Sequence, residues 1–82
     1  MYHGTGKKSY NSILSSGIKK MSRQYVHLSQ DINTAVNVGK RHGEPIVFKV
    51  DAMQMYKDGI KFYISENNVV LTDFVDTKYL IY

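Results

Sequence analysis

The segment YVHLS at residues 25–29 alternates polar and apolar side chains in the pattern of a half-buried strand. Because strand side chains point alternately to opposite faces, Tyr25, His27 and Ser29 are expected on one face, with the valine and leucine between them in the core. An aromatic ring, an imidazole and a hydroxyl in a row can bind a nucleoside, since the ring stacks on the base and the polar groups bond sugar hydroxyls. An ordinary strand with polar residues on its exposed face is the alternative interpretation.

A second histidine, His3, belongs to the glycine-rich stretch HGTGKKS at residues 3–9. This stretch is not the phosphate loop G-x-x-x-x-G-K-[ST], because Lys8 stands where that motif needs Ser or Thr. We expect a short edge strand over residues 1–3 that runs into a turn at residues 4–6, where Gly4 lets the backbone approach a ligand closely. Taken alone, a histidine such as His3 is more often a surface residue than a ligand-binding one.

Two histidines also raise the question of a metal site. His3 and His27 would supply two ligands, but no other nearby His, Cys or pair of carboxylates completes a zinc set. We therefore expect no bound metal.

Cationic side chains accompany both histidine segments. Arg23 lies four residues before His27, and a guanidinium group is well suited to bidentate phosphate binding. Lys40 and Arg41 lie between glycines in GKRHG at residues 39–43, in a segment able to approach a pyrophosphate. A basic helix C-terminus that favours cations explains this second pair equally well.

The composition narrows the class of protein. The 82 residues are expected to form one domain, and the net charge of +4 comes from basic residues concentrated in the first half. This asymmetry suggests an anionic partner, with a solvated basic surface as the alternative. The chain has no cysteine, no long apolar run and no secretory signal at its start, so we expect a cytoplasmic protein without a membrane segment.

The hydrophobic spacing predicts two to three short helices and several strands. The first helix is expected at residues 7–16, ended by Gly17. A second is capped by Ser29 or Asp31, has Ile32, Ala35 and Val36 on its apolar face, and ends near residues 39–43. A short turn of helix over residues 52–55 is capped by Asp51. The remaining strands are expected at residues 46–50 after Pro45, at residues 61–64 and 69–71 around a turn at Asn67 and Asn68 that contains Glu66, and at residues 77–82. This order predicts an α+β fold with a small antiparallel sheet.

Four segments together resemble one known family. They are HGT at residues 3–5, SILSSGIKKMSRQYVHLS at 12–29, VGKRHGEPIVFKVDA at 38–52 and DGIKFYISENNVVLT at 58–72. In this order they resemble the C-terminal lobe of the RNA 2′-phosphotransferases, NAD-dependent enzymes that remove a 2′-phosphate left by tRNA splicing. The resemblance implies an ADP-ribosyltransferase-like split antiparallel β-sheet over residues 1–82 and the absence of the family's N-terminal RNA-binding lobe.

The resemblance also implies roles for individual residues. His3 and His27 would line the NAD cleft, a third position that is apolar in this branch falls at Val69 or Val70, and Arg23 would be the catalytic arginine of this lobe. The remaining residues expected to contact NAD or ADP-ribose are Gly4, Thr5, Tyr25, Ser29 and Arg41. In the family reaction the RNA 2′-phosphate attacks the nicotinamide ribose and expels nicotinamide.

Three functions follow from these expectations. The favoured one is a module that binds NAD, ADP-ribose or a related nucleotide without full catalysis, for instance to sequester an ADP-ribosyl signal in phage counter-defence. The alternative is a transferase that acts alone, as a homo-oligomer or with a partner protein that completes its site. Plain RNA binding is disfavoured, because the RNA-binding lobe of the family is missing from the match and no separate basic stripe is seen.

Overall fold

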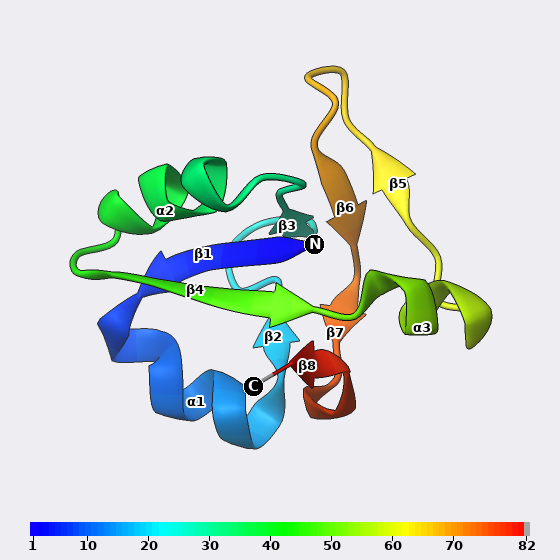
Figure 1. Cartoon of the computed structure of the whole chain (residues 1–82), viewed down its shortest axis with the longest axis horizontal. Coiled ribbons are helices and arrows are strands. Elements are labelled where there is room, and N and C mark those ends of the chain that lie inside the picture. The colour runs from blue at the N-terminus through cyan, green and yellow to red at the C-terminus, as the bar shows by residue number, and fades with distance from the viewer. Residues whose placement is uncertain (82) are drawn as a thin grey trace.

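The computed structural model describes residues 1–81 and consists of eight short strands, three short α-helices and two 3-10 turns (Figure 1). The strands are β1 (Tyr2–Gly6), β2 (Ile18–Lys19), β3 (Val26–Leu28), β4 (Pro45–Val50), β5 (Tyr63–Ile64), β6 (Val70–Thr72), β7 (Phe74–Val75) and β8 (Leu80–Ile81). The helices are α1 (Tyr10–Ser16), α2 (Ile32–Lys40) and α3 (Ala52–Lys57), and the 3-10 turns are Lys7–Ser9 and Thr77–Tyr79. The predicted α+β fold is confirmed.

The strands pair in three antiparallel sheets, with the orders β1-β4-β8, β2-β7 and β3-β6-β5. Tyr2 and Ser29 join the first and third sheets, because each backbone N–H donates to the other's carbonyl oxygen at 2.7 Å. The N-terminal strand therefore lies beside the end of β3, although they are far apart in the sequence. This is the split antiparallel arrangement that brings residues 3 and 27 close together.

The glycines near the N-terminus belong to a strand, so the predicted turn at residues 4–6 is wrong. β1 continues through Gly6 and pairs with β4 in register from Tyr2 opposite Lys49 to Gly6 opposite Pro45. α2 packs across β1, and a Cβ atom added to Gly4 would overlap the carbonyl oxygen of Ala35. The glycine at position 4 thus permits close helix–strand packing instead of a turn.

The helix boundaries follow the predicted caps. Asp31, and not Ser29, begins α2, because its carboxylate accepts the backbone N–H of Thr34 at 2.9 Å. Asp51 caps α3 in the same way, through the N–H of Gln54 at 3.2 Å. Gly17 ends α1 with a φ of 82°, a left-handed value that favours glycine.

The apolar face of α2 is only partly as predicted. Ala35 is fully buried and Gly39 is also buried, four residues further along the same face. Ile32, in contrast, is 50% exposed, so its assignment to the packed face is wrong. α2 can lie very close to β1 because the residues at the helix–strand contact, such as Ala35, Gly39 and Gly4, are small.

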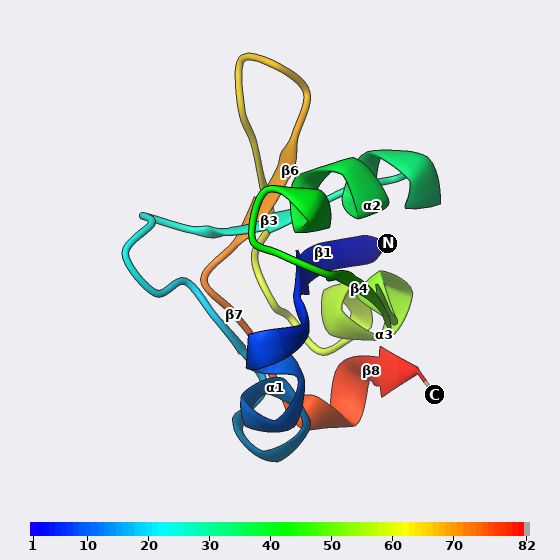
Figure 2. The ribbon, with the colours of Figure 1, turned by 90° about the vertical axis from the view of Figure 1, so that its left-hand side faces the viewer.

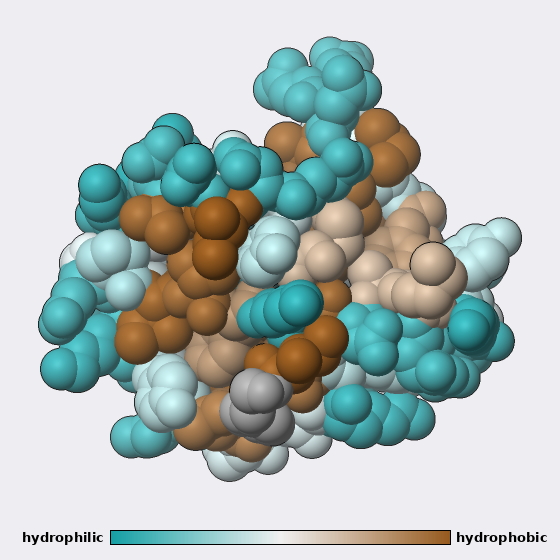
Figure 3. Space-filling model, viewed as in Figure 1, coloured by the Kyte–Doolittle hydropathy of each residue, from teal (hydrophilic) through white to brown (hydrophobic). Residues whose placement is uncertain are grey.

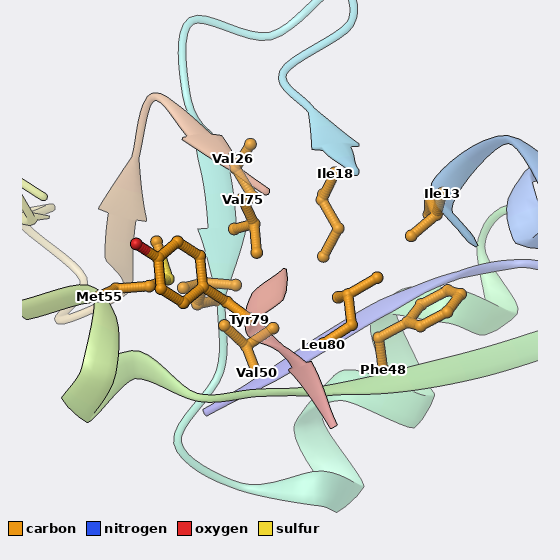
Figure 4. Packing of buried hydrophobic residues seen from close by; sticks show 10 residues of the cluster. Ile13, Ile18, Val26, Phe48, Val50, Met55, Val75, Tyr79 and Leu80 are labelled. Atoms are coloured by element: carbon orange, nitrogen blue, oxygen red, sulfur yellow. The ribbon is translucent and has the colours of Figure 1, made fainter. Parts of the chain in front are cut away.

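The core lies between the sheets and α1 (Figure 4). Val26 and Leu28 are 2% and 1% exposed, which confirms that the apolar residues of YVHLS point inward. Ile18 and Val75, opposite each other in β2 and β7, join the same cluster. The other fully or nearly buried members are Ile13, Phe48, Val50, Met55, Tyr79 and Leu80.

The predicted hairpin is present between β5 and β6. The backbone N–H of Ser65 donates to the carbonyl of Val69 at 2.9 Å, and Asn68 adopts a φ of 62° in the turn. Glu66 lies in this turn, as expected, and the projecting tip is hydrophilic in Figure 3. The same view shows apolar side chains gathered where β1 and β4 run between α2 and α1.

The last predicted strand, residues 77–82, is shorter than expected. Thr77–Tyr79 forms a 3-10 turn in which Asp76 accepts the N–H of Lys78, and only β8 is extended. Residue 82 lies outside the described residues. The hydroxyl of Tyr79 donates to the Asp58 carboxylate at 2.6 Å, which anchors this turn to the end of α3.

Candidate functional site

A cleft with a volume of about 460 Å³ opens between β1, β3, the loop after β2 and the C-terminal end of α2. In Figure 2 this loop projects to the left of the molecule. Eight site residues predicted from the sequence line the cleft: His3, Gly4, Thr5, Arg23, Tyr25, His27, Ser29 and Arg41. The fold therefore gathers into one place residues that are spread over half of the chain. Lys40, the other cation considered for a pyrophosphate, is not a lining residue.

β1 and β3 hold two histidines beside each other. The Nδ1 atom of His3 lies 2.9 Å from the carbonyl oxygen of His27, and the Nδ1 atom of His27 lies 3.1 Å from the carbonyl oxygen of Tyr25. A carbonyl oxygen can only accept a hydrogen bond, so each Nδ1 must carry the proton. In the neutral form of both rings, Nε2 is then a hydrogen-bond acceptor.

The environment of His3 favours the neutral imidazole. Burial lowers the pKa of His3 below the usual 6.5, because the charged ring loses its hydration. The bond to the His27 carbonyl opposes this shift, whereas the charges of His27, His42 and Arg23 add to it. At neutral pH the Nε2 atom of His3 therefore keeps its lone pair.

The cleft is positive and contains no carboxylate among its lining residues. Lys19, Lys20, Arg23 and Arg41 line it, together with all three histidines of the protein. Lys7 and Glu44 form an ion pair at 3.7 Å, and neither residue lines the cleft. A concave surface with several cations and no acid concentrates anions.

The two arginines reach the cleft from different elements. Arg23 lies in the loop between β2 and β3, where its backbone N–H donates to the carbonyl of Lys20 at 2.9 Å and closes a turn. Arg41 follows the last residue of α2, and its backbone N–H donates to the carbonyl of Val38 at 3.2 Å. Both side chains are exposed at the rim and can bind a charged ligand without a large desolvation cost.

Tyr25 supplies an aromatic wall. Its ring lies against that of Tyr63 in β5, with 5.0 Å between the ring centroids and 43° between the planes. This contact restricts the orientation of a side chain that also lines the cleft. The third sheet therefore positions the aromatic ring as well as His27.

An apolar side chain, that of Val69, is also among the residues that line the cleft. Val70, in contrast, packs against the core. Glu66 lies in the hairpin turn and is not a lining residue. Of the two valines considered from the sequence, Val69 lines the cleft and Val70 does not.

Several lining residues were missed, and His42 is the most informative of them. It lines the cleft next to Arg41, and its charge acts on His3. Its place in GKRHG, directly after Arg41, was the available signal. The hydroxyl residues Ser9, Ser22 and Thr34 also line the cleft, and nothing in their sequence context marks them.

Neither a metal site nor a membrane-spanning helix is found in the part of the chain that the structure describes. No group of three or more His, Cys, Asp or Glu residues is arranged to hold a metal ion there. None of the helices in that part has the length and apolar character needed to span a membrane.

Known proteins show what the chain is similar to. Residues 1–74 match the model of a family described as RNA 2′-phosphotransferase, Tpt1 / KptA family. A probable RNA 2′-phosphotransferase of Trichormus variabilis is 59% identical over 80 residues, and one of Flavobacterium johnsoniae is 58% identical over 80 residues. A third, of Fusobacterium nucleatum, is 56% identical over 81 residues. Each comparison covers 98% of this chain but only 44% or 45% of the relative, so the chain spans less than half of their length.

Proposed function

Because the chain belongs to the RNA 2′-phosphotransferase, Tpt1 / KptA family, we propose that its cleft binds the ADP-ribosyl part of NAD or of a related ADP-ribose derivative. The observation that carries the proposal is the convergence of three histidines and four cationic side chains, without a carboxylate, in one cleft. Its volume of about 460 Å³ lies in the range of small-molecule and cofactor sites.

The cationic side chains would bind the diphosphate of the ligand. Arg41 follows α2 at one side of the cleft, and Arg23 comes from the loop at the other. Guanidinium groups bind phosphate oxygens in pairs of parallel hydrogen bonds, and these bonds are about twice as strong as neutral ones. A pyrophosphate that enters the cleft meets donors and no repelling acid.

The two histidines His3 and His27 would bind a ribose of the ligand. Each imidazole has its Nδ1 held by a backbone carbonyl, so in its neutral form it offers an Nε2 acceptor. Two neighbouring hydroxyl groups of a ribose are matching donors. Thr5, from β1, and Ser29, directly after β3, add hydroxyl groups that can donate or accept.

Tyr25 would stack on a flat ring of the ligand. Tyr25 stands in the cleft with its ring supported by Tyr63. Stacking on either the adenine or the nicotinamide ring would use its exposed face. Gly4, which lines the cleft without a side chain, leaves room beside it.

A second function is transfer of ADP-ribose to an RNA 2′-phosphate; it is favoured by the similarity to probable RNA 2′-phosphotransferases and by Arg23 in the cleft. In this reaction a phosphate oxygen forms a bond to C1 of the nicotinamide ribose as the bond to nicotinamide breaks. Arg23 would hold the attacking phosphate in place, and its charge would stabilise the transition state. A further lobe or a partner chain would supply other groups, as the greater length of the relatives suggests.

Thermal unfolding in the presence of ligands tests the binding proposal. ADP-ribose and NAD should raise the melting temperature in a concentration-dependent manner, since a ligand that binds only the folded state stabilises it by mass action. Nicotinamide release from NAD in the presence of 2′-phosphorylated RNA then separates the two functions. Binding without release supports a sequestering module, release supports the transferase, and the absence of any thermal shift at millimolar ligand refutes both.

A further inference from the structure

The two-stranded sheet of β2 and β7 has one buried face and one exposed face. Ile18 lies opposite Val75, and both side chains are in the core at 1% and 0% exposure. The next pair, Lys19 opposite Phe74, must point the other way, because strand side chains alternate. Residues directly opposite in an antiparallel pair have Cβ atoms about 5 Å apart, so a cation and an aromatic ring lie side by side on the surface.

The ring of Phe74 is held in position but remains accessible. A Cβ atom added to Gly17 would lie 2.9 Å from the Cζ atom of Phe74, so the ring lies against the bare backbone at Gly17. Phe74 is nevertheless 41% exposed. An exposed aromatic ring that the fold fixes in place is a stacking surface, and nothing in the proposed nucleotide site uses it.

A second hollow, of about 450 Å³, lies over this ribbon and continues the first cleft. It is lined by Lys19, Lys20, Met21, Asp73 and Phe74, and the first three of these also line the main cleft. Met21, 83% exposed with a φ of 54°, stands between the two hollows. In Figure 2, β7 and the loop after β2 lie on the same side of the molecule.

We propose that this hollow binds one nucleotide of a single-stranded RNA whose neighbouring nucleotide occupies the main cleft. The base stacks on Phe74, and the phosphodiester that connects the two nucleotides lies against Lys19 and Lys20. The proposal rests on the second proposed function, the transferase, because it places the RNA substrate beside the same cleft.

The chemistry of the hollow fits RNA better than a simple anion. A small anion would need only the lysines, whereas a cation beside a fixed aromatic ring matches the alternation of phosphate and base along a strand. Asp73 repels phosphate at its edge of the hollow, and its carboxylate can accept a hydrogen bond from a ribose hydroxyl or a base amino group. The acid therefore favours the phosphate at the lysine side.

The test measures the anisotropy of a fluorescein-labelled oligoadenylate of about eight nucleotides with one internal 2′-phosphate, a length within the usual range of single-strand sites. F74L keeps an apolar side chain over Gly17 but removes the stacking ring, and should weaken RNA binding about 5- to 100-fold. F74W should restore binding. The affinity for ADP-ribose, measured separately, should be the same in F74L as in the wild type, because Phe74 does not line the main cleft.

The lysines are tested through salt dependence. The double variant K19Q/K20Q should reduce the slope of log affinity against log salt by about 0.7, since the two lysines bind one phosphodiester and each phosphate contact with a single strand contributes about 0.7. K49Q/K57Q, which removes two exposed lysines outside both hollows, is the matched control and should leave the slope unchanged.

The outcomes separate the two proposals. Wild-type RNA affinity in F74L, or equal changes of slope in the two double variants, would overturn the RNA site and leave the nucleotide cleft intact. No ADP-ribose binding together with a clear F74L effect would overturn the proposed function and leave this hollow as an RNA site. No RNA binding by the wild-type protein would overturn the RNA site as well.

Discussion

The Nδ1 atom of His3 lies 2.9 Å from the backbone carbonyl oxygen of His27, a residue 24 positions further along the chain. This contact depends on the backbone pairing of Tyr2 with Ser29, which places β1 beside the end of β3. It also determines which ring nitrogen of His3 carries the proton. The pairing of β1 with the end of β3 thus determines that Nδ1 of His3 carries the proton and that Nε2 is the acceptor of the neutral ring.

The Nε2 acceptors are tested by replacing each histidine with asparagine. The Nδ2 group of Asn can occupy the place of Nδ1 and keep the bond to the carbonyl, while the acceptor at Nε2 is lost. We expect H3N and H27N each to weaken ADP-ribose binding roughly 3- to 10-fold, the usual net value of a neutral hydrogen bond. Calorimetry measures the affinity, and unfolding in urea serves as the control for stability. Unchanged affinity in both variants would show that the imidazoles do not bind the ligand.

The lowered pKa of His3 makes stability depend on pH. Above the ordinary pKa of 6.5, the ring is neutral in both the folded and the unfolded protein and contributes no pH dependence. Below it, the unfolded chain takes up the proton more readily, so the free energy of unfolding should fall as the pH drops towards the lowered folded pKa. Urea unfolding between pH 7 and pH 5 should show this loss, and H3N should show a smaller one. An equal pH dependence in the two proteins would contradict the assignment to His3.

Close packing between α2 and β1 predicts a large effect at Gly4. In G4A the new methyl group would overlap the backbone of Ala35, so we expect a loss of about 3 kcal/mol or more in the free energy of unfolding. Gly43 is the matched control, because a Cβ atom there meets nothing within 4 Å and G43A changes only a backbone with a φ of 116°. G43A should cost about 1–2 kcal/mol. Equal costs in the two variants would refute the packing account.

Much of the fold follows from local patterns in the sequence. The alternation in YVHLS predicts correctly that Val26 and Leu28 are buried, and Asp51 and Gly17 mark helix ends as expected. The strand through Gly4 and Gly6 does not follow from local preference, because isolated glycines suggest a turn. At these positions α2 or the chain after it approaches β1 so closely that only glycine fits. This requirement of the tertiary packing overrides the local preference of glycine for turns.

The candidate site was predictable where it rests on strands and less so where it rests on helix ends. The alternation over residues 25–29 predicts Tyr25 and His27, and both line the cleft. His42 was not predicted as a lining residue, because a residue just beyond a helix can point in several directions. The packing of α2 on β1 determines its direction. The same packing leaves Ile32 exposed, since Ala35 and Gly39 form the contact.

Arg23 distinguishes catalysis from binding. R23K keeps the positive charge but loses the planar pair of donors that holds a phosphate. If the chain releases nicotinamide from NAD in the presence of 2′-phosphorylated RNA, R23K should lower the rate about 100-fold or more, while the affinity for ADP-ribose changes less than 10-fold. R41K is the comparison, because Arg41 lies at the α2 end of the cleft and is expected to act on affinity. A rate unaffected by R23K would remove Arg23 from the reaction.

The central claim is that one cleft with three histidines and four cations binds the ADP-ribosyl group. Calorimetric titration of the protein with ADP-ribose tests it most directly, with R41Q as the variant that removes one cation from the lining. We predict saturable binding at one site, weakened roughly 10- to 100-fold in R41Q, as expected for the loss of charge-assisted hydrogen bonds. No heat of binding at millimolar ADP-ribose, or equal affinity in the wild type and R41Q, would contradict the account.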